Sequence, residues 1–430
     1  MKSTLSNWLK GSGIVALWIL AGALVFVIFS GTLWVTGGFM KGYPALILAI
    51  IVAFIISRIA VNRSSSNIGK ILRLTPVTIF LMIVFWSMIP IASDELVSFP
   101  DEPNMEMWDL GSDRIISISH HRPSDDVTEQ EEAIIFIHGG PGAYVRDFDR
   151  DFAASFAENG YHVFVYDQVG AGRSPIIDVQ DYTHEGNAAD LDKIIKKIDK
   201  PVILFGQSYG AGLASSYLDY HKNDHNVRKL ILTEPGPLPG AFPQTGPYYD
   251  EKTTSAENFD DPGFFEAVSS PRFLFGMILP VGNTFIGQQE MMNSITPKLQ
   301  EKIVATSFCK DNDEAIPEFK KLRVNPLASR NIRSSYISEE TPNLTNVDIP
   351  VMMILGECSY FPRGYVMEYF EAFSINRSHW IPGVGHILWG TEKGKHLTRE
   401  AILSFLNNTE MPLPNEPDYD SRFEFIEQGR

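Results

Sequence analysis

This sequence of 430 residues contains almost no cysteine: Cys309 and Cys358 are the only two. Two cysteines are too few for a disulfide framework, and their spacing matches no pattern of metal ligands. The sequence does not decide whether they pair, and for Cys358 the simplest interpretation is a buried structural thiol. We expect neither a bound metal ion nor a cofactor.

Positive charge is also scarce. Lys and Arg number 36 against 52 Asp and Glu, which gives a formal net charge of −16. No basic patch or nucleic-acid-binding motif is present, so nucleic acid is not an expected partner. An acidic surface favours solubility and cationic ligands. The partner that we expect is a small-molecule or peptide substrate, and the sequence does not set the oligomeric state.

Charge of either sign is nearly missing from three apolar stretches at residues 14–35, 43–61 and 76–92. Each approaches or reaches the length that an α-helix needs to cross a bilayer. We therefore predict a membrane region over residues 1–93 with about three transmembrane helices, in contact with the lipid bilayer. A secretory signal is the alternative for the first stretch, but two further stretches follow it and no cleavage site stands out.

Basic residues predict how this region is oriented. Arg58, Arg63, Lys70 and Arg73 lie in or next to the second link, whereas the first link has only Lys41. Cytoplasmic loops carry the excess of Lys and Arg, so the N-terminus and second link are expected in the cytoplasm. The sequence therefore predicts an integral protein of the cell membrane, with the rest of the chain on the extracytoplasmic side.

Helical and strand patterns alternate after the membrane region. A hairpin is predicted over residues 105–119 and helices over 152–158 and 188–198, with apolar strands at 133–137, 162–166, 202–205, 229–233 and 351–356. This alternation predicts the α/β class, with a doubly wound, mostly parallel sheet and active residues at the carboxyl ends of its strands. The pattern lapses over residues 236–346, where we expect a mainly helical cap inserted between core segments 94–235 and 347–410. Residues 411–430 form an acidic tail.

One short motif indicates a nucleophile. Residues 206–210, Gly-Gln-Ser-Tyr-Gly, follow the apolar run 202–205 and lead into small residues. Strand, sharp turn and helix in this order form a nucleophile elbow, which exposes the serine hydroxyl above the sheet edge at a helix N-terminus. The two glycines leave room for the turn. Ser208 is the candidate nucleophile.

Backbone amides near Ser208 can form an oxyanion hole. The predicted strand 133–137 ends at residues 138–142, His-Gly-Gly-Pro-Gly. Glycine-rich backbone just after a buried strand can turn an N–H toward a bound carbonyl. We choose Gly140 as one donor and the N–H of Tyr209 as the other. A simple tight turn is the alternative interpretation of the glycine-rich segment.

The candidate general base is His386, which follows a late predicted strand. There it can take a proton from Ser208 and return it to the leaving group. The order serine, acid, histidine is the one that hydrolases of the nucleophile-elbow type use.

These motifs resemble those of the proline iminopeptidase family of α/β-hydrolases. Residues 138–142 match the family's oxyanion motif, and residues 167–174, Asp-Gln-Val-Gly-Ala-Gly-Arg-Ser, resemble a second motif. The likeness extends from about residue 105 to 408. It implies an α/β-hydrolase fold with a cap and a serine-based hydrolytic mechanism. Many relatives with this signature cleave esters, amides or other substrates, so fold and chemistry transfer better than substrate does.

The resemblance implies an aspartate three residues after Gly356, but Ser359 stands there. Two glutamates can replace it: Glu234, at the end of the preceding predicted strand, and Glu357, directly after Gly356. We place Glu234 slightly ahead, because a carboxylate at a neighbouring strand end can approach the base. Both can also be solvated loop residues. If neither serves, activity is reduced or lost, because a serine hydrolase without its acid keeps only part of its rate.

The sequence therefore predicts a membrane-anchored serine hydrolase that cleaves an amide or ester through an acyl-enzyme. The resemblance favours a proline iminopeptidase-like aminopeptidase, in which pocket and cap carboxylates bind the substrate's free amine. Possible counterparts of those carboxylates are Glu251, Glu257, Glu266 and Glu290. No motif aligns any of them with the family's positions. The alternatives are an esterase or lipase-like enzyme and a binding protein on the same fold. A dehalogenase is disfavoured, because its nucleophile would be aspartate.

Overall fold

The computed structural model describes residues 104–222, 226–240, 287–292, 307–309, 324–359, 361 and 363–410. The chain divides into two compact units. The described part of the first unit is residues 287–292, with the short helix α10 (Gln288–Glu290). The second unit contains all the other described residues.

The three predicted membrane spans, most of the predicted cap and the tail lie outside the described ranges. A search of the helices within those ranges finds none with both the length and the apolar character needed to cross a membrane.

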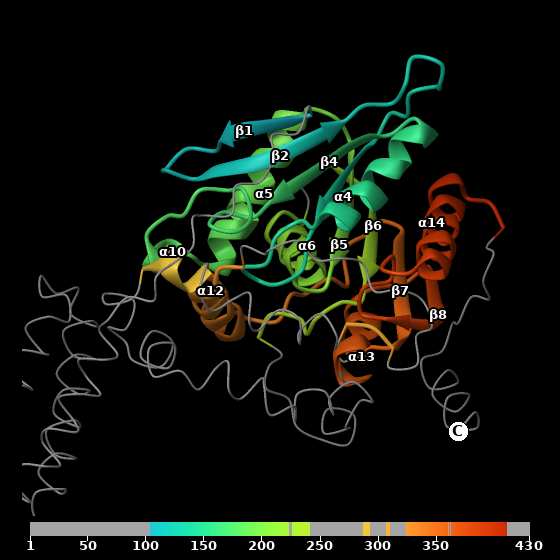
Figure 1. Cartoon of the computed structure of the whole chain (residues 1–430). Helices are drawn as coiled ribbons and strands as arrows, with labels where there is room; N and C mark the ends of the chain where they lie inside the picture. The colour runs from blue at the N-terminus through green and yellow to red at the C-terminus, as the bar shows by residue number, and fades with distance from the viewer. Residues whose placement is uncertain are drawn as a thin grey trace, which may run out of the picture. The chain divides into compact units, whose positions relative to one another are not determined.

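Eight strands form one sheet within the described second unit (Figure 1). In sheet order they are β1 (Met105–Asp109), β2 (Ile115–His121), β4 (His162–Asp167), β3 (Ala133–Ile137), β5 (Val202–Gln207), β6 (Val227–Thr233), β7 (Val351–Cys358) and β8 (Arg377–Gly385). β1 and β2 form an antiparallel hairpin, and β2 also pairs antiparallel with β4. The pairings from β4 through β8 are all parallel. The predicted hairpin and mostly parallel sheet are confirmed.

Both faces of the sheet are buried, as the continuous apolar strands require. Ile135 and Ile137 of β3 face one core, and Ile134 and Phe136 face the other. The first core packs under α5 (His184–Ile198), α6 (Tyr209–Tyr220), α12 (Pro326–Ser338) and α13 (Arg363–Ala372). The second packs under α4 (Asp147–Ala154), the 3₁₀ turn η1 (Ser155–Asn159) and α14 (Glu392–Asn407) (Figure 1). A second 3₁₀ turn, η2 (Val179–Asp181), precedes α5.

Two predicted helices begin earlier than the apolar pattern indicated. α4 begins at Asp147 and α5 at His184, because polar first turns are stabilised by local hydrogen bonds. At α5 the Thr183 side chain accepts the N–H of Gly186, which caps a turn that has no apolar pattern. The apolar pattern therefore identified the buried faces of these helices rather than their starts.

Helix α12 lies in the segment predicted as cap and is fixed to the core at its N-terminus. The Asn325 side chain accepts the N–H groups of Leu327 and Ala328, and its own amide donates to Gly170 O at 2.8 Å. The Asn325 N–H donates to Gly142 O at 2.8 Å. An asparagine followed by proline at N1 is a typical helix start. The helix is thereby tied directly to the glycine-rich loop after β3.

The two cysteines form a disulfide, with their Cα atoms 5.3 Å apart. The interpretation of Cys358 as a free buried thiol is wrong, since its sulfur is bonded to a cysteine 49 residues earlier in the sequence. The bond joins segment 307–309 to the end of β7. Segment 307–309 also contacts the loop after β8, where the N–H of Ile387 donates to Ser307 O at 3.3 Å.

Candidate active site

Ser208 lies at the turn between β5 and α6, as the motif predicted. Its backbone has φ 56° and ψ −120°, a conformation that L-residues rarely adopt and that costs about 1–3 kcal/mol. The surrounding structure holds it there: the Ser208 N–H donates to Thr233 O at 3.0 Å, and its carbonyl accepts the N–H of Gly236 at 3.2 Å. The turn is therefore braced against the end of β6. The Ser208 side chain lines a pocket above the sheet.

Close approaches explain two of the glycines around Ser208. A Cβ on Gly210 would overlap the carbonyl oxygen of Ile137 at the end of β3. A Cβ on Gly139 would lie 2.8 Å from the Cβ of Ser208. Larger residues at these positions would push the elbow and the oxyanion loop apart.

The two predicted oxyanion donors both border the pocket that contains Ser208. The N–H of Tyr209 is in the first turn of α6, where N–H groups have no acceptor within the helix. Gly140 has φ 138°, a backbone conformation that glycine adopts much more readily than other residues. The neighbouring N–H of Gly139 is occupied, since it donates to Gln207 Oε1 at 3.0 Å. This occupancy leaves Gly140 as the candidate donor on that loop.

His386 follows β8 directly and is hydrogen-bonded to Glu234. The distance from His386 Nδ1 to Glu234 Oε2 is 3.2 Å, and the two residues are only 4% and 1% exposed. Glu234 follows β6 and has φ 45°, a second non-glycine residue in the left-handed region at a strand end. The backbone thus turns the Glu234 carboxylate toward the base.

Ser359 is hydrogen-bonded to the glutamate that takes the place of the expected aspartate. Its hydroxyl donates to Glu234 Oε2, and the N–H of Gly356 donates to Glu234 Oε1. Each oxygen of the Glu234 carboxylate therefore accepts one of these hydrogen bonds, and Oε2 also faces His386. Glu357 points elsewhere: its Oε2 accepts the N–H of Gly383 at 2.6 Å in an exposed contact. Of the two candidate acids, the structure brings only Glu234 to His386.

Gln207 connects the base to the oxyanion loop, a contact that the sequence analysis missed. Because Oε1 accepts the N–H of Gly139, the amide nitrogen faces His386 Nε2 at 3.3 Å. An amide N–H donates, so Nε2 accepts and the imidazole proton lies on Nδ1, facing Glu234. In this tautomer Nε2 carries the lone pair that a general base needs, and here this lone pair faces the Gln207 amide.

A buried polar cluster supports Tyr209 from below. The Tyr209 hydroxyl lies 2.9 Å from His184 Nδ1 and 3.2 Å from Asn187 Nδ2, and His184 Nε2 lies 2.8 Å from Ser216 Oγ. Burial lowers the pKa of His184 to about 3 and raises the pKa of Tyr209 well above its usual value. Both groups are therefore neutral near pH 7, although the Glu339 carboxylate lies 3.9 Å from His184 Nε2.

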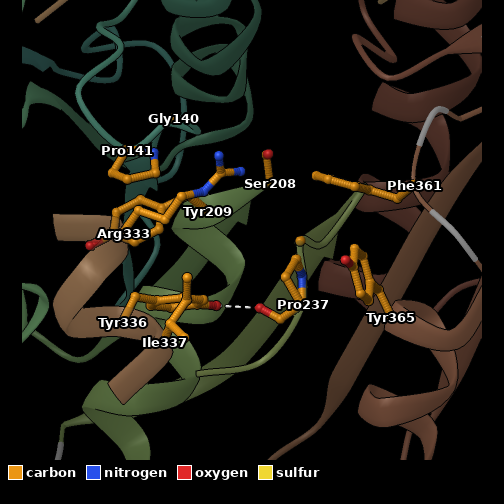
Figure 2. Close-up of a pocket in the computed structure, with 11 residues that line it drawn as sticks. Gly140, Pro141, Ser208, Tyr209, Pro237, Arg333, Tyr336, Ile337, Phe361 and Tyr365 are labelled. Atoms are coloured by element: carbon orange, nitrogen blue, oxygen red, sulfur yellow. Dashed lines mark hydrogen bonds between the residues drawn. The ribbon is translucent and has the colours of Figure 1, made fainter. Parts of the chain in front are cut away.

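The pocket above Ser208 has a volume of about 230 Å³, and Figure 2 shows its lining. Its described walls come from the oxyanion loop, the elbow, the segment after β6, helix α12 and the start of α13. The side chains are mostly aromatic or apolar, and Arg333 is the single charged one among the described lining residues. The Phe361 ring stands edge-on to the His386 ring, with 5.0 Å between centroids. None of the site residues predicted from the sequence lies on α12, although Asn325-Pro326 indicates the start of that helix.

A mostly parallel sheet whose central strand leads through a strained serine into a helix is the α/β-hydrolase arrangement, and the chain has that fold. The family described as "alpha/beta hydrolase fold" matches residues 132–267. The match covers the oxyanion loop and the elbow, and it ends within the predicted cap.

Proline iminopeptidases are among the homologues of this chain. That of Saccharolobus solfataricus is 31% identical over 129 residues, which are 29% of this chain and 39% of that protein. That of Thermoplasma volcanium is 36% identical over 111 residues, or 24% of this chain and 35% of that protein. That of Lactiplantibacillus plantarum is 34% identical over 120 residues, or 26% of this chain and 40% of that protein. The matched segments thus span less than half of each relative.

Solved structures resemble the chain more remotely than these relatives do. An esterase from Exiguobacterium antarcticum superposes with a TM-score of 0.49 at 18% identity, over 68% of this chain and 96% of that one. A proline iminopeptidase from Mycobacterium smegmatis gives 0.46 at 15% identity, over 71% of this chain and 98% of that one. We draw no conclusion about substrate from likenesses this remote.

Proposed function

We propose that the chain is a serine hydrolase that cleaves an amide or ester through an acyl-enzyme. The observation that carries the proposal is the buried hydrogen bond between His386 Nδ1 and Glu234 Oε2, at the sheet edge where Ser208 is exposed to the pocket. A histidine base with an orienting carboxylate is the arrangement that activates a serine hydroxyl, and the proposal requires that Nε2 of this base reaches Ser208 during the reaction.

In the proposed mechanism Ser208 Oγ attacks the substrate carbonyl and His386 Nε2 takes its proton. The N–H groups of Gly140 and Tyr209 stabilise the oxyanion. His386 then protonates the leaving amine or alcohol, which departs and leaves an ester on Ser208. Water, deprotonated by His386, hydrolyses that ester and restores the serine. Glu234 holds the imidazole in the required tautomer and stabilises the imidazolium.

For the substrate, homology favours peptides with an N-terminal proline. Iminopeptidases are among the relatives, and the matched family model covers residues 132–267, which hold the oxyanion loop and the elbow; this supports shared chemistry at Ser208. The described pocket lining contains no carboxylate that could bind a proline amine. Glu290 belongs to the other compact unit, and Glu251, Glu257 and Glu266 lie outside the described residues. An esterase or amidase of other specificity is therefore the second candidate.

The decisive experiment is labelling with a fluorophosphonate probe, which reacts with activated serines. We expect the wild type to be labelled and Ser208→Ala to remain unlabelled, with Ser215→Ala, a buried serine on α6 away from the pocket, as the control variant. Equal labelling of wild type and Ser208→Ala would refute the assignment. A wild type that is neither labelled nor active on prolyl amides and short esters would favour a binding protein.

We further propose that the chain is anchored in the cell membrane by residues 1–93, with the hydrolase domain on the extracytoplasmic side. Two independent observations support this placement: the distribution of Lys and Arg around the apolar stretches, and the disulfide between Cys309 and Cys358. Disulfides persist in oxidising compartments and are rare in the cytosol. Thiol accessibility in intact cells tests the proposal, as described in the Discussion.

A further inference from the structure

Arg333 places a positive charge in the pocket of Ser208. Figure 2 shows its guanidinium directed across the pocket toward Ser208, next to the oxyanion loop. The neighbouring described walls are formed by Pro141, Pro237, Tyr336, Phe361 and Tyr365. Apolar and aromatic walls exclude water from around a charge and so strengthen its interaction with a bound ligand.

The helix that carries Arg333 is fixed to the hydrolase core at several points. Besides the contacts of Asn325 at its start, Asn331 Nδ2 donates to Val179 O at 2.6 Å. Ser335 Oγ accepts the N–H of His184 at 2.7 Å, and the Tyr336 hydroxyl donates to Pro237 O. Arg333 lies between these anchors. Its backbone position relative to Ser208 is therefore determined by the core, which is what a residue that selects substrates requires.

The guanidinium has no carboxylate partner among the described residues. Aspartates and glutamates form salt bridges with arginines elsewhere in the domain, as Asp190 does with Arg114 at 2.7 Å. Arg333 acts electrostatically on Tyr365: burial is the main cause that raises the pKa of Tyr365, the Glu368 carboxylate adds to the rise, and the Arg333 charge opposes it. Within the described ranges no acid forms a salt bridge with this guanidinium, so its N–H groups can meet a ligand in the pocket. A guanidinium offers paired N–H donors that match a carboxylate.

We propose that Arg333 is a specificity-determining residue that binds a carboxylate of the substrate, close to the bond that Ser208 cleaves. The inference rests on the proposed acyl transfer at Ser208 and adds the class of substrate. Two kinds of substrate meet the requirement. A dipeptide carries the carboxylate on its leaving group, and a dicarboxylic acid monoester carries it on its acyl group. A cationic amine would be repelled from this wall of the pocket.

Matched pairs of substrates distinguish the two kinds. For the acyl side we would compare 4-nitrophenyl hemiglutarate with neutral 4-nitrophenyl valerate, and for the leaving side prolylglycine with prolylglycinamide. The readout is the ratio of kcat/KM for the anionic member to that for the neutral member. In Arg333→Gln we expect this ratio to fall by about tenfold or more for one pair, mainly through KM. Arg333→Lys should keep part of the preference, because it retains the charge but loses the paired donors.

Arg330→Gln is the control, because Arg330 lies one turn earlier on α12 and does not line the pocket. It should leave both ratios unchanged. The inference would be overturned if both ratios were the same in Arg333→Gln as in the wild type. That result would not contradict the proposed hydrolase activity.

Failure of the proposed function gives a different result, namely no fluorophosphonate labelling and no turnover. In that case calorimetric titration with glutarate still tests the inference. We expect binding to the wild type that weakens by about tenfold in Arg333→Gln. Equal binding to both proteins, or binding to neither, would contradict it.

Discussion

At the scale of single residues, the acid of this site is divided between two positions. The carboxylate comes from Glu234 after β6, and the end of β7, where an aspartate was expected, contributes the Ser359 hydroxyl as a donor to that carboxylate. The Glu234 backbone is held by its own N–H, which donates to Ile354 O at 3.0 Å. Both strand ends therefore act on the His386 imidazole. Glu234, after β6, accepts its N–H, and Ser359, after β7, holds the Glu234 carboxylate.

This division predicts the effect of changing the acid. Glu234→Ala should lower kcat by about 10³- to 10⁴-fold, because the imidazole loses the group that sets its tautomer. Adding Ser359→Asp to that variant should restore part of the rate, since residue 359 already reaches the oxygen that faces His386. The measurement is steady-state hydrolysis of an activated ester.

Glu357→Gln is the matched control, as Glu357 contacts the backbone of Gly383 and not the base. We expect its rate to stay close to that of the wild type. A Glu234→Ala variant with full activity, or a large loss in Glu357→Gln, would show that the acid has been assigned to the wrong residue.

At the scale of elements, His184 joins three helices. It is the first residue of α5, its ring contacts Tyr209 and Ser216 of α6, and its N–H donates to Ser335 of α12. His184 thus supports the candidate oxyanion donor Tyr209 through its ring and the helix that carries Arg333 through its backbone N–H. The ring is not exposed to solvent at all.

The lowered pKa of His184 predicts that stability depends on pH. The folded protein takes up this proton only near pH 3, whereas an unfolded histidine takes it up near pH 6.5. The unfolded state therefore binds more protons between these values. The contribution of His184 is complete above about pH 6.5 and is lost as the pH falls toward 3, by at most about 1.4 kcal/mol per pH unit.

The check is to measure urea unfolding midpoints of the wild type and His184→Gln from pH 7 to pH 4. The variant should be less stable at pH 7, and the difference should shrink as the pH falls. His120→Gln is a useful comparison, because burial also lowers the pKa of His120, to about 4, at a place far from the site on β2. Parallel curves for the wild type and His184→Gln would contradict the prediction.

The elements also show what sequence can and cannot predict. Strands β3 to β7 were predictable because each contains a contiguous apolar run that is buried in the sheet. The elbow and the base were predictable from local motifs at strand ends. The sequence placed Glu234 only slightly ahead of Glu357. The role of Gln207 and the position of Arg333 were not predictable, because each depends on how distant segments meet. Glu234 and His386, for example, are 152 residues apart in the sequence.

At the scale of the whole molecule, the disulfide connects the predicted membrane topology to the fold. Cys309–Cys358 closes a loop of 49 residues, for which chain entropy gives about 4 kcal/mol of stabilisation. The bond is stable only where the compartment is oxidising. The extracytoplasmic placement that we propose would therefore favour the folded hydrolase domain.

We expect a maleimide reagent to modify the denatured wild type only after reduction. In intact cells, a membrane-impermeant reductant followed by an impermeant maleimide should also label it. For comparison, Cys309→Ser/Cys358→Ser carrying Ser65→Cys in the second predicted link should be labelled only after the membrane is permeabilised. Free thiols in unreduced wild type, or labelling of Ser65→Cys in intact cells, would contradict the predicted placement.

The arrangement of Glu234 and Ser359 bears on how such a site can change during evolution. The parallel strands β6 and β7 end side by side, and either end can present a carboxylate to the histidine after β8. An ancestor with a carboxylate at both strand ends could lose one of them and still keep a carboxylate that orients its histidine. A screen that recognises active hydrolases by an aspartate after the seventh strand would then discard chains like this one as degenerate, although their imidazole is fully oriented.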